Sequence, residues 1–143
     1  MPAVPINISP PTAETQWVCM TITNWLQSTI KLQNPHLTSG KFLNDYSSRD
    51  GIYGSVTNVP IYPSRSWPVS SSGSGTRVLG TSGSIDLYEG RTSICTLHWN
   101  CPGGHQQNYL QAQNVNNNYV VTVGRFRDYG AIGDVSIAVQ RAS

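Results

Sequence analysis

The ten-residue stretch TLHWNCPGGH, from Thr96 to His105, combines a tryptophan and a cysteine with two histidines. Cysteine and histidine are side chains that zinc prefers, and together they also form nucleophilic pairs. A zinc site needs about four ligands held together, yet no second Cys-x-x-Cys or His-x-His pair accompanies this one. In an extended strand His98 and Cys101 also point to opposite faces, because side chains alternate. The spacing therefore predicts no metal site.

Other patterns that support catalysis are also weak in this sequence. The segment SSGSGT only approximates the Gly-x-Ser-x-Gly turn of serine hydrolases, and no helical pattern follows it. The seven acidic residues are widely spaced and offer no carboxylate pair for sugar hydrolysis. The glycine-rich GTSGS precedes a strand pattern, so it provides no helix N-terminus to hold a phosphate. We therefore expect a protein that is not an enzyme, with no catalytic residues and no cofactor.

The charge pattern limits the kinds of partner. Charged residues make up 11% of the chain, whereas roughly 25% is typical of globular proteins. The nine basic residues are scattered and the net charge is only +2, which argues against nucleic-acid binding, since that requires clustered lysine and arginine. Serine, threonine, asparagine, glutamine and glycine supply the polarity instead. Such a hydrogen-bonding surface is common in secreted all-β proteins and in proteins that bind sugars or lipid headgroups.

The aromatic residues are the remaining candidates for a binding surface: four tryptophans, seven tyrosines and two phenylalanines. Trp17 alternates with Val18 and Met20, so it points outward if those apolar residues form the core. Trp99 lies on the apolar face of its own segment and is expected in the core. Exposed tryptophan and tyrosine suit a membrane interface, and they stack equally well on sugars. Both interpretations stay open at this point.

Strands must position these residues, because apolar and polar residues alternate with a period of two along most of the chain. The alternation is clear in six segments: QWVCMTITN, STIKLQN, GSIDLYEG, SICTLHWNC, NNYVVTVGRF and DVSIAVQ. Glycine, proline, asparagine and serine interrupt them at short intervals, which is typical of a β-sandwich or barrel. We expect one domain, residues 15–143, preceded by an extended arm, residues 1–14, that contains four prolines.

The middle of the chain is less regular. Between residues 34 and 80 only short β-like pieces are recognisable. The segment SSSGSG, Ser70 to Gly75, is expected to be a flexible loop between strands. Trp67 stands next to Pro68, and we expect it in a loop-like region as well.

Three cysteines, Cys19, Cys95 and Cys101, are an odd number, so at least one thiol stays free or pairs between chains. Of the possible pairs, Cys95 and Cys101 are favoured for a bridge, if one exists. Both Cys19 and Cys95 alternate with apolar residues, where buried thiols are more common than disulfides. We therefore do not expect a fold held by a disulfide framework.

The N-terminus and the hydropathy pattern bear on whether the protein is secreted or spans a membrane. The sequence MPAVPINISPPTAE has neither the basic nor the apolar region of a conventional signal peptide. No apolar run approaches the roughly 20 residues of a membrane-spanning helix. We expect any contact with a membrane to occur from the water side.

Four segments of the chain, taken in order, resemble motifs of a known family. They are TQWVCMTITN, GTSGSIDLYEG, LHWNCPGG and DYGAIGDVSIAV. They are similar to the Gln-Trp-Val strand, the Gly-Thr-Thr-Gly-x-Phe-Asp-Leu segment, the Trp-Asp-Cys-Pro-Trp-Gly motif and the Gly-Ala-Ile/Leu-Gly-x-x-x-Val end of the aegerolysins. The resemblance covers about Thr15 to Val139. It implies an all-β, single-domain β-sandwich of two mainly antiparallel sheets.

The resemblance to aegerolysins, which occur in fungi and bacteria, also implies a non-enzymatic protein that binds a membrane lipid. Family members recognise sphingolipids, often sphingomyelin together with sterol, or ceramide phosphoethanolamine. Several are the membrane-targeting component of a two-component pore-forming cytolysin, whose channel is formed by a larger protein of the membrane-attack-complex/perforin type. Members lack a conventional signal peptide. The resemblance therefore implies release by another route, a cytoplasmic pool, and a peripheral position on target membranes.

The resemblance further implies which residues take part. Lipid binding is expected at five positions: Trp17, Lys41, Leu79, Gly103 and His105. Trp99 and Cys101 match the tryptophan and cysteine of the Trp-Asp-Cys motif, and we expect them in the structural core. Gly103 and Ser39, however, stand where family members usually have tryptophan. Leu79 falls near the position of a glutamate that contacts the lipid headgroup in sphingolipid-binding members.

These departures remove side chains directed at the membrane, so two other functions remain as alternatives. One is a carbohydrate-binding module on the same sandwich, which the low charge and the many amide side chains favour. The other is a self-assembling protein that has lost lipid binding.

Overall fold

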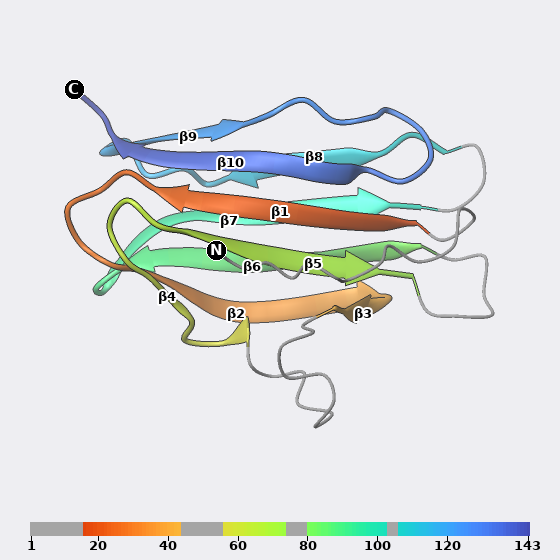
Figure 1. The fold of residues 1–143 in the computed structure, drawn as a ribbon, viewed down its shortest axis with the longest axis horizontal. Coiled ribbons are helices and arrows are strands. Elements are labelled where there is room, and N and C mark those ends of the chain that lie inside the picture. Colours follow the sequence, from red (N-terminus) through yellow and green to blue (C-terminus); the bar gives the residue numbers. More distant parts are fainter. Residues whose placement is uncertain (1–15, 44–55, 74–79, 103–105) are drawn as a thin grey trace.

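The computed structural model describes residues 16–43, 56–73, 80–102 and 106–143, which fold into two five-stranded β-sheets that face each other (Figure 1). The strand order in the first sheet is β3 (Lys41–Phe42), β5 (Ser66–Ser72), β1 (Trp17–Asn24), β10 (Gly133–Arg141) and β9 (Tyr119–Val123). The order in the second sheet is β4 (Pro60–Ile61), β2 (Ile30–Ser39), β6 (Thr81–Glu89), β7 (Thr92–Cys101) and β8 (Tyr109–Gln113). The prediction of an all-β sandwich is confirmed. The expected arm, residues 1–14, lies outside the described residues.

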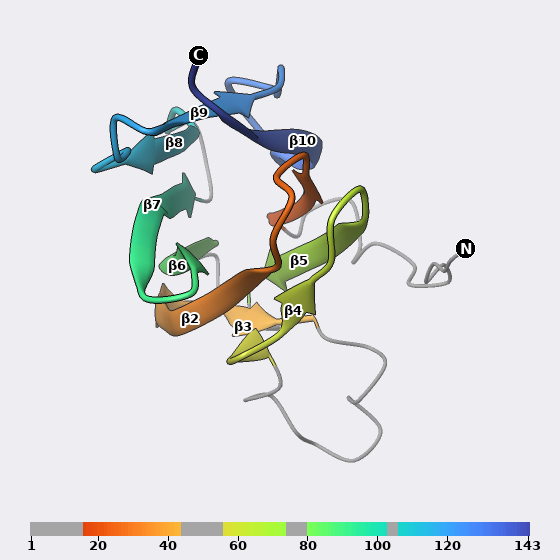
Figure 2. The ribbon, with the colours of Figure 1, turned by 90° about the vertical axis from the view of Figure 1, so that its left-hand side faces the viewer.

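The pairing of the strands is mainly antiparallel. Among the described strands the parallel pair is β1 with β10, in which Val18 stands opposite Gly133 and Asn24 opposite Val139. Figure 2 views the sandwich along its strands, with β8 and β9 in contact along one edge. Each strand thus has one face toward the other sheet and one face outward, which accounts for the period-two alternation in the sequence.

The core lies between the two sheets. In β1, Val18, Met20 and Ile22 are fully buried, and they alternate with partly exposed residues. The second sheet supplies a matching apolar row: Leu32, Ile85, Leu87, Leu97 and Trp99. Burial of one such side chain is worth about 1.5–3 kcal/mol, and a shift of register by one residue would expose the whole row. The alternation therefore fixes which face of each strand turns inward.

Strand β5 corrects two of the expectations from sequence. Ser70, Ser71 and Ser72 are not a loop but the last residues of β5, and Trp67 also lies within this strand. Ser71 and Ser72 are buried. The hydroxyl of Ser71 donates a hydrogen bond to the carbonyl oxygen of Lys41 (2.8 Å). Because a neighbouring strand satisfies that hydroxyl, a polar residue is tolerated at an inward position.

Strand β2 is longer than the alternation predicted. It continues through Asn34 to Ser39, with a shift of register against β6 between Gln33 and His36. Asn34 has a φ of 52°, and its side-chain amide donates to Asp86 Oδ2 (2.8 Å). The register shift between Gln33 and His36 is a β-bulge. It interrupts the period-two alternation, so the sequence pattern does not reveal that the strand continues.

The three cysteines are free thiols. The pair considered for a bridge, Cys95 and Cys101, lies on one strand six positions apart, which is about 20 Å at roughly 3.3 Å per residue. A disulfide needs Cα atoms within about 7 Å, so this pair is excluded by geometry. Burial, and to a lesser extent the charge of Asp86, raises the pKa of Cys95 to about 12.

Candidate functional site

Several strands of both sheets begin or end together near Trp17 (Figure 1). β1 begins at Trp17, which pairs in register with Ser72, the last residue of β5. In the other sheet β7 ends at Cys101, whose Sγ lies 3.8 Å from the carbonyl oxygen of Trp17. Both sheets therefore contribute to this end of the sandwich, which we call the Trp17 end.

An open pocket of about 470 Å³ lies at the Trp17 end. Trp17 lines it together with the connection between β9 and β10 and the start of β10: Arg125, Phe126, Arg127, Ala131, Ile132, Gly133 and Asp134. We call it the Trp17 pocket. Its lining residues include a tryptophan, two arginines and an aspartate, so residues of both charges share one pocket with an aromatic residue.

The connection between β9 and β10 is held in place by Asn108. The side-chain amide of Asn108 donates to the carbonyl oxygens of Arg127 and Gly130, each at 2.9 Å. Its backbone N–H donates to the carbonyl oxygen of Asp128 at 2.7 Å. Three hydrogen bonds from one buried residue thus fix the backbone that carries the two arginines.

Cys101 joins the same connection to β1. Its Sγ accepts a hydrogen bond from the N–H of Ile132 (3.4 Å) and lies 3.5 Å from the carbonyl oxygen of Gly130. Burial raises the pKa of this thiol, so the sulfur keeps its proton and serves as both a weak donor and a weak acceptor. Cys101 is fully buried, and its contacts are those of a packing residue that positions the pocket wall.

The charged groups of the Trp17 pocket are available to a ligand. Arg125 and Arg127 are exposed. Within the described ranges the only ion pair joins Arg141 to Glu89, so neither arginine has a described carboxylate partner. Asp134 stands opposite Cys19 in the strand register. Burial raises the pKa of the Cys19 thiol, and the negative charge of Asp134 adds to the rise.

Two of the five residues expected to bind lipid lie at the Trp17 end. Trp17 is half-buried at the pocket, and Lys41 is exposed on β3. Lys41 pairs with Ser72, which in turn pairs with Trp17, so the three residues form one row across three strands. Leu79, Gly103 and His105 lie outside the described residues.

Trp99 is completely buried between the sheets. Its indole N–H donates to Thr81 Oγ1 at 3.0 Å. Its ring meets that of Phe42 edge-on, with 6.1 Å between the ring centroids. The side chain therefore packs in the core and satisfies its one polar atom there.

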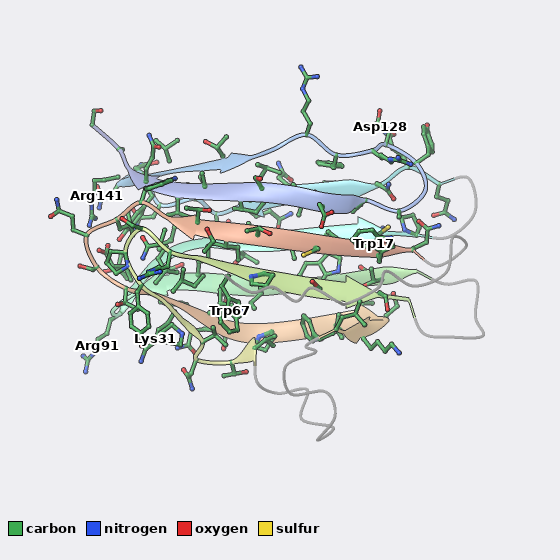
Figure 3. All side chains as sticks on the ribbon, in the orientation of Figure 1. Trp17, Lys31, Trp67, Arg91, Asp128 and Arg141 are labelled. Carbon is green, nitrogen blue, oxygen red and sulfur yellow. The ribbon has the colours of Figure 1, made fainter. Side chains whose placement is uncertain are left out.

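The other aromatic residues are divided between the ends. Tyr109 pairs with Asn100 near the end of β7, so it lies at the Trp17 end, where it is 37% exposed. Trp25 follows the last residue of β1 and is at the opposite end of the sandwich. Trp67 pairs with Ile22 and lies toward that opposite end too (Figure 3). Of these three, only Tyr109 is on the same end as Trp17.

Arg125, Arg127 and Asp134 were missed by reasoning from sequence. The run GRFRDYG, in which two arginines flank Phe126, was the available signal. It was overlooked because nothing in the sequence brings this run near Trp17. The parallel pairing of β1 with β10 makes that contact.

The described part of the chain offers neither a metal cluster nor a membrane-spanning helix. No group of three or more histidine, cysteine, aspartate or glutamate side chains is close enough there to hold a metal ion. The same residues contain no helix with the length and apolarity to cross a bilayer.

These features define a small two-sheet β-sandwich protein with an aromatic, charged pocket at one end of its strands. The chain belongs to the aegerolysin family, whose sequence model matches residues 15–142. The resemblance stated from four motifs is thereby confirmed. Asp-hemolysin of Aspergillus fumigatus is 36% identical over 132 residues, which cover 90% of this chain and 95% of that protein. Aegerolysin Aa-Pri1 of Cyclocybe aegerita is 29% identical, covering 90% and 92%.

Solved structures show the same fold. RahU, in complex with a TRIS molecule, superposes with a TM-score of 0.81 at 23% identity, covering 90% of this chain and 96% of RahU. IP-1A from Alcaligenes faecalis has a TM-score of 0.77 at 27% identity, covering 92% and 94%. The lipid-binding protein Nakanori is more distant, with a TM-score of 0.59 at 12% identity and coverage of 88% and 71%.

Proposed function

We propose that this protein binds a membrane lipid at the Trp17 pocket and carries out no reaction on it. The observation that carries the proposal is the composition of the pocket: a half-buried indole, two arginines without a described carboxylate partner, and Asp134. Tryptophan favours the level of the headgroups in a bilayer, because its ring is apolar and its N–H is polar.

The pocket suits a headgroup that carries both charges. A phosphate is bound well by guanidinium groups, which present several donors in a planar fork. An ammonium group is attracted by the carboxylate of Asp134 and by the face of the Trp17 ring. Sphingomyelin and ceramide phosphoethanolamine both carry a phosphate and a positively charged ammonium group. Glycerophospholipids can carry the same headgroups, so the choice of a sphingolipid rests on family membership. We propose a phosphosphingolipid, with or without sterol in the same membrane, as the ligand.

Lys41 is included in the proposed contact because it projects from the same row as Trp17. Family membership supports the proposal, and the relatives bear names such as Asp-hemolysin and, among structures, lipid-binding protein. We further propose that the protein is peripheral on its target membrane and serves as the membrane-targeting component of a cytolysin. A pore-forming protein of the membrane-attack-complex/perforin type would then be its partner.

The test is sedimentation with vesicles of phosphatidylcholine that contain sphingomyelin, sphingomyelin with cholesterol, or ceramide phosphoethanolamine. Trp17→Ala removes roughly 100 Å² of aromatic contact, worth about 2.5 kcal/mol, so binding is expected to fall about 50- to 100-fold. Replacing Arg125 and Arg127 by glutamine is expected to weaken binding at least about tenfold, because charge-assisted hydrogen bonds are lost.

Trp25→Ala is the matched control, since it removes an exposed indole from the opposite end. Equal losses for the Trp17 and Trp25 variants would contradict the assignment of the pocket. Folded protein that binds none of these vesicles would overturn lipid binding itself. Binding that free sugars abolish would favour the carbohydrate-binding alternative.

A further inference from the structure

The end of the sandwich opposite Trp17 carries two protruding aromatic side chains. Trp25, in the connection between β1 and β2, is 57% exposed, and Tyr62, in the connection between β4 and β5, is 59% exposed. Large aromatic side chains so far out of the core contribute nothing to its packing. We call this region the Trp25 end; Figure 2 views the molecule from this side.

A buried asparagine joins the two connections that carry these rings. Asn24 is fully buried, and its amide donates to the carbonyl oxygens of Ser28 and Ile61, each at 2.8 Å. Its Oδ1 accepts the N–H of Leu26 (2.8 Å). The residue after Asn24 is Trp25 and the residue after Ile61 is Tyr62. One side chain therefore fixes the backbone beside both rings.

The backbone of Asn24 adds to this connection. Its N–H donates to the carbonyl oxygen of Arg65 (2.9 Å), and its own carbonyl accepts from Ser64 (2.7 Å). The N–H of Trp25 donates to the carbonyl oxygen of Val139 in β10 (2.9 Å). Because the turns are tied to each other and to the sheet, the aromatic residues are presented without a large ordering cost on binding.

The charges at the Trp25 end are predominantly positive. Four basic side chains are exposed there: Lys31, Arg91 and Arg141, which Figure 3 labels, and Arg65 in the connection between β4 and β5. The acid placed among them in the described structure is Glu89, which accepts hydrogen bonds from Arg141 (2.9 Å) and Tyr119 (2.5 Å). Lys31, Arg65 and Arg91 form no ion pair with a described carboxylate.

One of these cations lies at a shallow open pocket. Arg91 lines a volume of about 340 Å³ together with Gln33, Asn34, Tyr88 and Gly90. The amides of Gln33 and Asn34 already donate to Asn58 and to Asp86, so the guanidinium group of Arg91 and the phenol of Tyr88 are the donors offered to a phosphate or carboxylate. The lining itself contains no acidic residue, and the carboxylate of Asp86 beside it is occupied by Asn34 and Thr96.

We propose that the Trp25 end docks on an anionic lipid surface. Uncompensated basic residues are attracted to acidic headgroups, while tryptophan and tyrosine settle at the headgroup level. A soluble polyanion would use the charges but would leave two protruding rings without a role. The eight residues of β1 separate the two ends by roughly 26 Å, so a molecule whose strands stand upright on a flat bilayer contacts it through one end only. If the proposed function also holds, one molecule bridges two membranes.

The test compares binding to phosphatidylcholine vesicles with and without phosphatidylserine. We call the affinity with phosphatidylserine divided by the affinity without it the phosphatidylserine ratio. Arg65→Gln with Arg91→Gln is expected to reduce that ratio about 30-fold, at about 1 kcal/mol per basic residue near the surface. Arg125→Gln with Arg127→Gln removes the same charge from the Trp17 end and is expected to keep most of the ratio. Equal loss in both double variants would overturn the proposal, because net charge alone would then explain binding.

The aromatic residues are tested by Trp25→Ala with Tyr62→Ala, which keeps every charge. We expect at least about a tenfold loss of affinity for the phosphatidylserine vesicles. No loss, together with equally tight binding to heparin, would show that the end recognises a soluble polyanion, and would also overturn the proposal.

A third measurement separates this proposal from the proposed function. Trp17→Ala is expected to keep the phosphatidylserine ratio while losing sphingolipid binding. If the wild type does not bind sphingolipid vesicles but still prefers vesicles with phosphatidylserine, only the proposal for the Trp17 pocket is rejected. If one molecule bridges two membranes, turbidity rises when sphingomyelin vesicles and phosphatidylserine vesicles are mixed with the protein. Trp17→Ala should prevent this rise, and so should Trp25→Ala with Tyr62→Ala.

Discussion

The two ends of the sandwich are formed by the same strands yet differ in chemistry (Figure 3). At the Trp17 end the indole is half-buried in a pocket whose cations have Asp134 beside them. At the Trp25 end the aromatic rings protrude, and the nearby acid, Glu89, is already bonded to Arg141. The strands supply most of the core, whereas the connections carry the exposed side chains of the two ends. The difference shows that the binding properties of this fold reside in its connections.

Each end also contains one buried asparagine that holds its connections. Asn24 has all its side-chain polar atoms paired, through Ser28, Ile61 and Leu26. Asn108 donates twice, but its Oδ1 has no partner among the described residues. The hydrogen-bonding groups of the buried asparagine are therefore more completely paired at the Trp25 end than at the Trp17 end. This contrast can be tested by removing each amide.

The largest effect is expected for Asn24→Ala. The change removes the amide partner of the buried carbonyl of Ile61, of the partly buried carbonyl of Ser28 and of the buried N–H of Leu26, so the free energy of unfolding should fall by about 3 kcal/mol or more. Urea denaturation followed by circular dichroism measures this loss. Asn24→Asp retains the acceptor for Leu26 and should be destabilised as well, because it lacks the two donors. A loss below about 1 kcal/mol for Asn24→Ala would contradict the central role of this side chain.

Asn108→Ala should have a smaller effect of about 2 kcal/mol, since only the two donated bonds are lost. We expect the loss to be local. Hydrogen exchange should accelerate in residues 124–133, and binding to sphingomyelin vesicles should weaken while the phosphatidylserine ratio is kept. Unchanged exchange in this segment would mean that Asn108 does not hold the wall of the Trp17 pocket.

The fold was largely predictable from sequence, and the pocket only in part. In β1 and β10 the alternation reports burial directly, because each strand has one face on the core. β5 escaped detection because Ser71, which pairs with the buried Val18, is a polar residue at an inward position, where its hydroxyl is satisfied inside the structure. Local sequence indicates on which face of its strand a side chain lies. It does not indicate which residue of another strand lies next to that side chain.

The candidate site illustrates that limit. The outward direction of Trp17 followed from its neighbours Val18 and Met20, and the structure has it half-buried at a pocket on the outer side of β1. Arg125 and Arg127 line the same pocket as Trp17 because β1 pairs with β10 in parallel. No motif within either segment specifies that pairing. Trp25 was placed at a strand end, but its relation to Tyr62 depends on Asn24, another contact between distant segments.

Salt should separate the two ends without any substitution. Raising the salt from about 0.1 M to about 1 M shortens the screening length from roughly 10 Å to 3 Å. Binding to phosphatidylserine vesicles should then weaken on the order of tenfold, since it depends on unpaired cations at the Trp25 end. Binding to zwitterionic sphingomyelin vesicles should change much less, because these vesicles carry no net charge that attracts the protein over a distance. Equal salt dependence on both kinds of vesicle would contradict the distinction between the ends.

The smallest effect concerns the acid of the Trp25 end. Burial alone would raise the pKa of Glu89, but hydrogen bonds from Tyr119 and Arg141 outweigh it and lower that pKa below its usual value. A carboxylate with a lowered pKa in the folded state adds stability above its unfolded pKa, near 4.3, and this stability is lost as the pH falls through the folded value. Wild-type stability should therefore decline as the solution is acidified below about pH 4.3, and Glu89→Gln should flatten that decline.

The matched control is Asp128→Asn, which removes an exposed acid of the Trp17 end that forms no ion pair in the described structure. In this variant the decline in stability at acid pH should stay close to that of the wild type. Thermal unfolding between about pH 3 and pH 6 measures both variants, a range that spans the unfolded pKa of a glutamate. If the Asp128 variant flattened the curve as much as the Glu89 variant, overall charge would explain the acid sensitivity. The bonded group at the Trp25 end would then have no special part in holding β6 to β9 and β10.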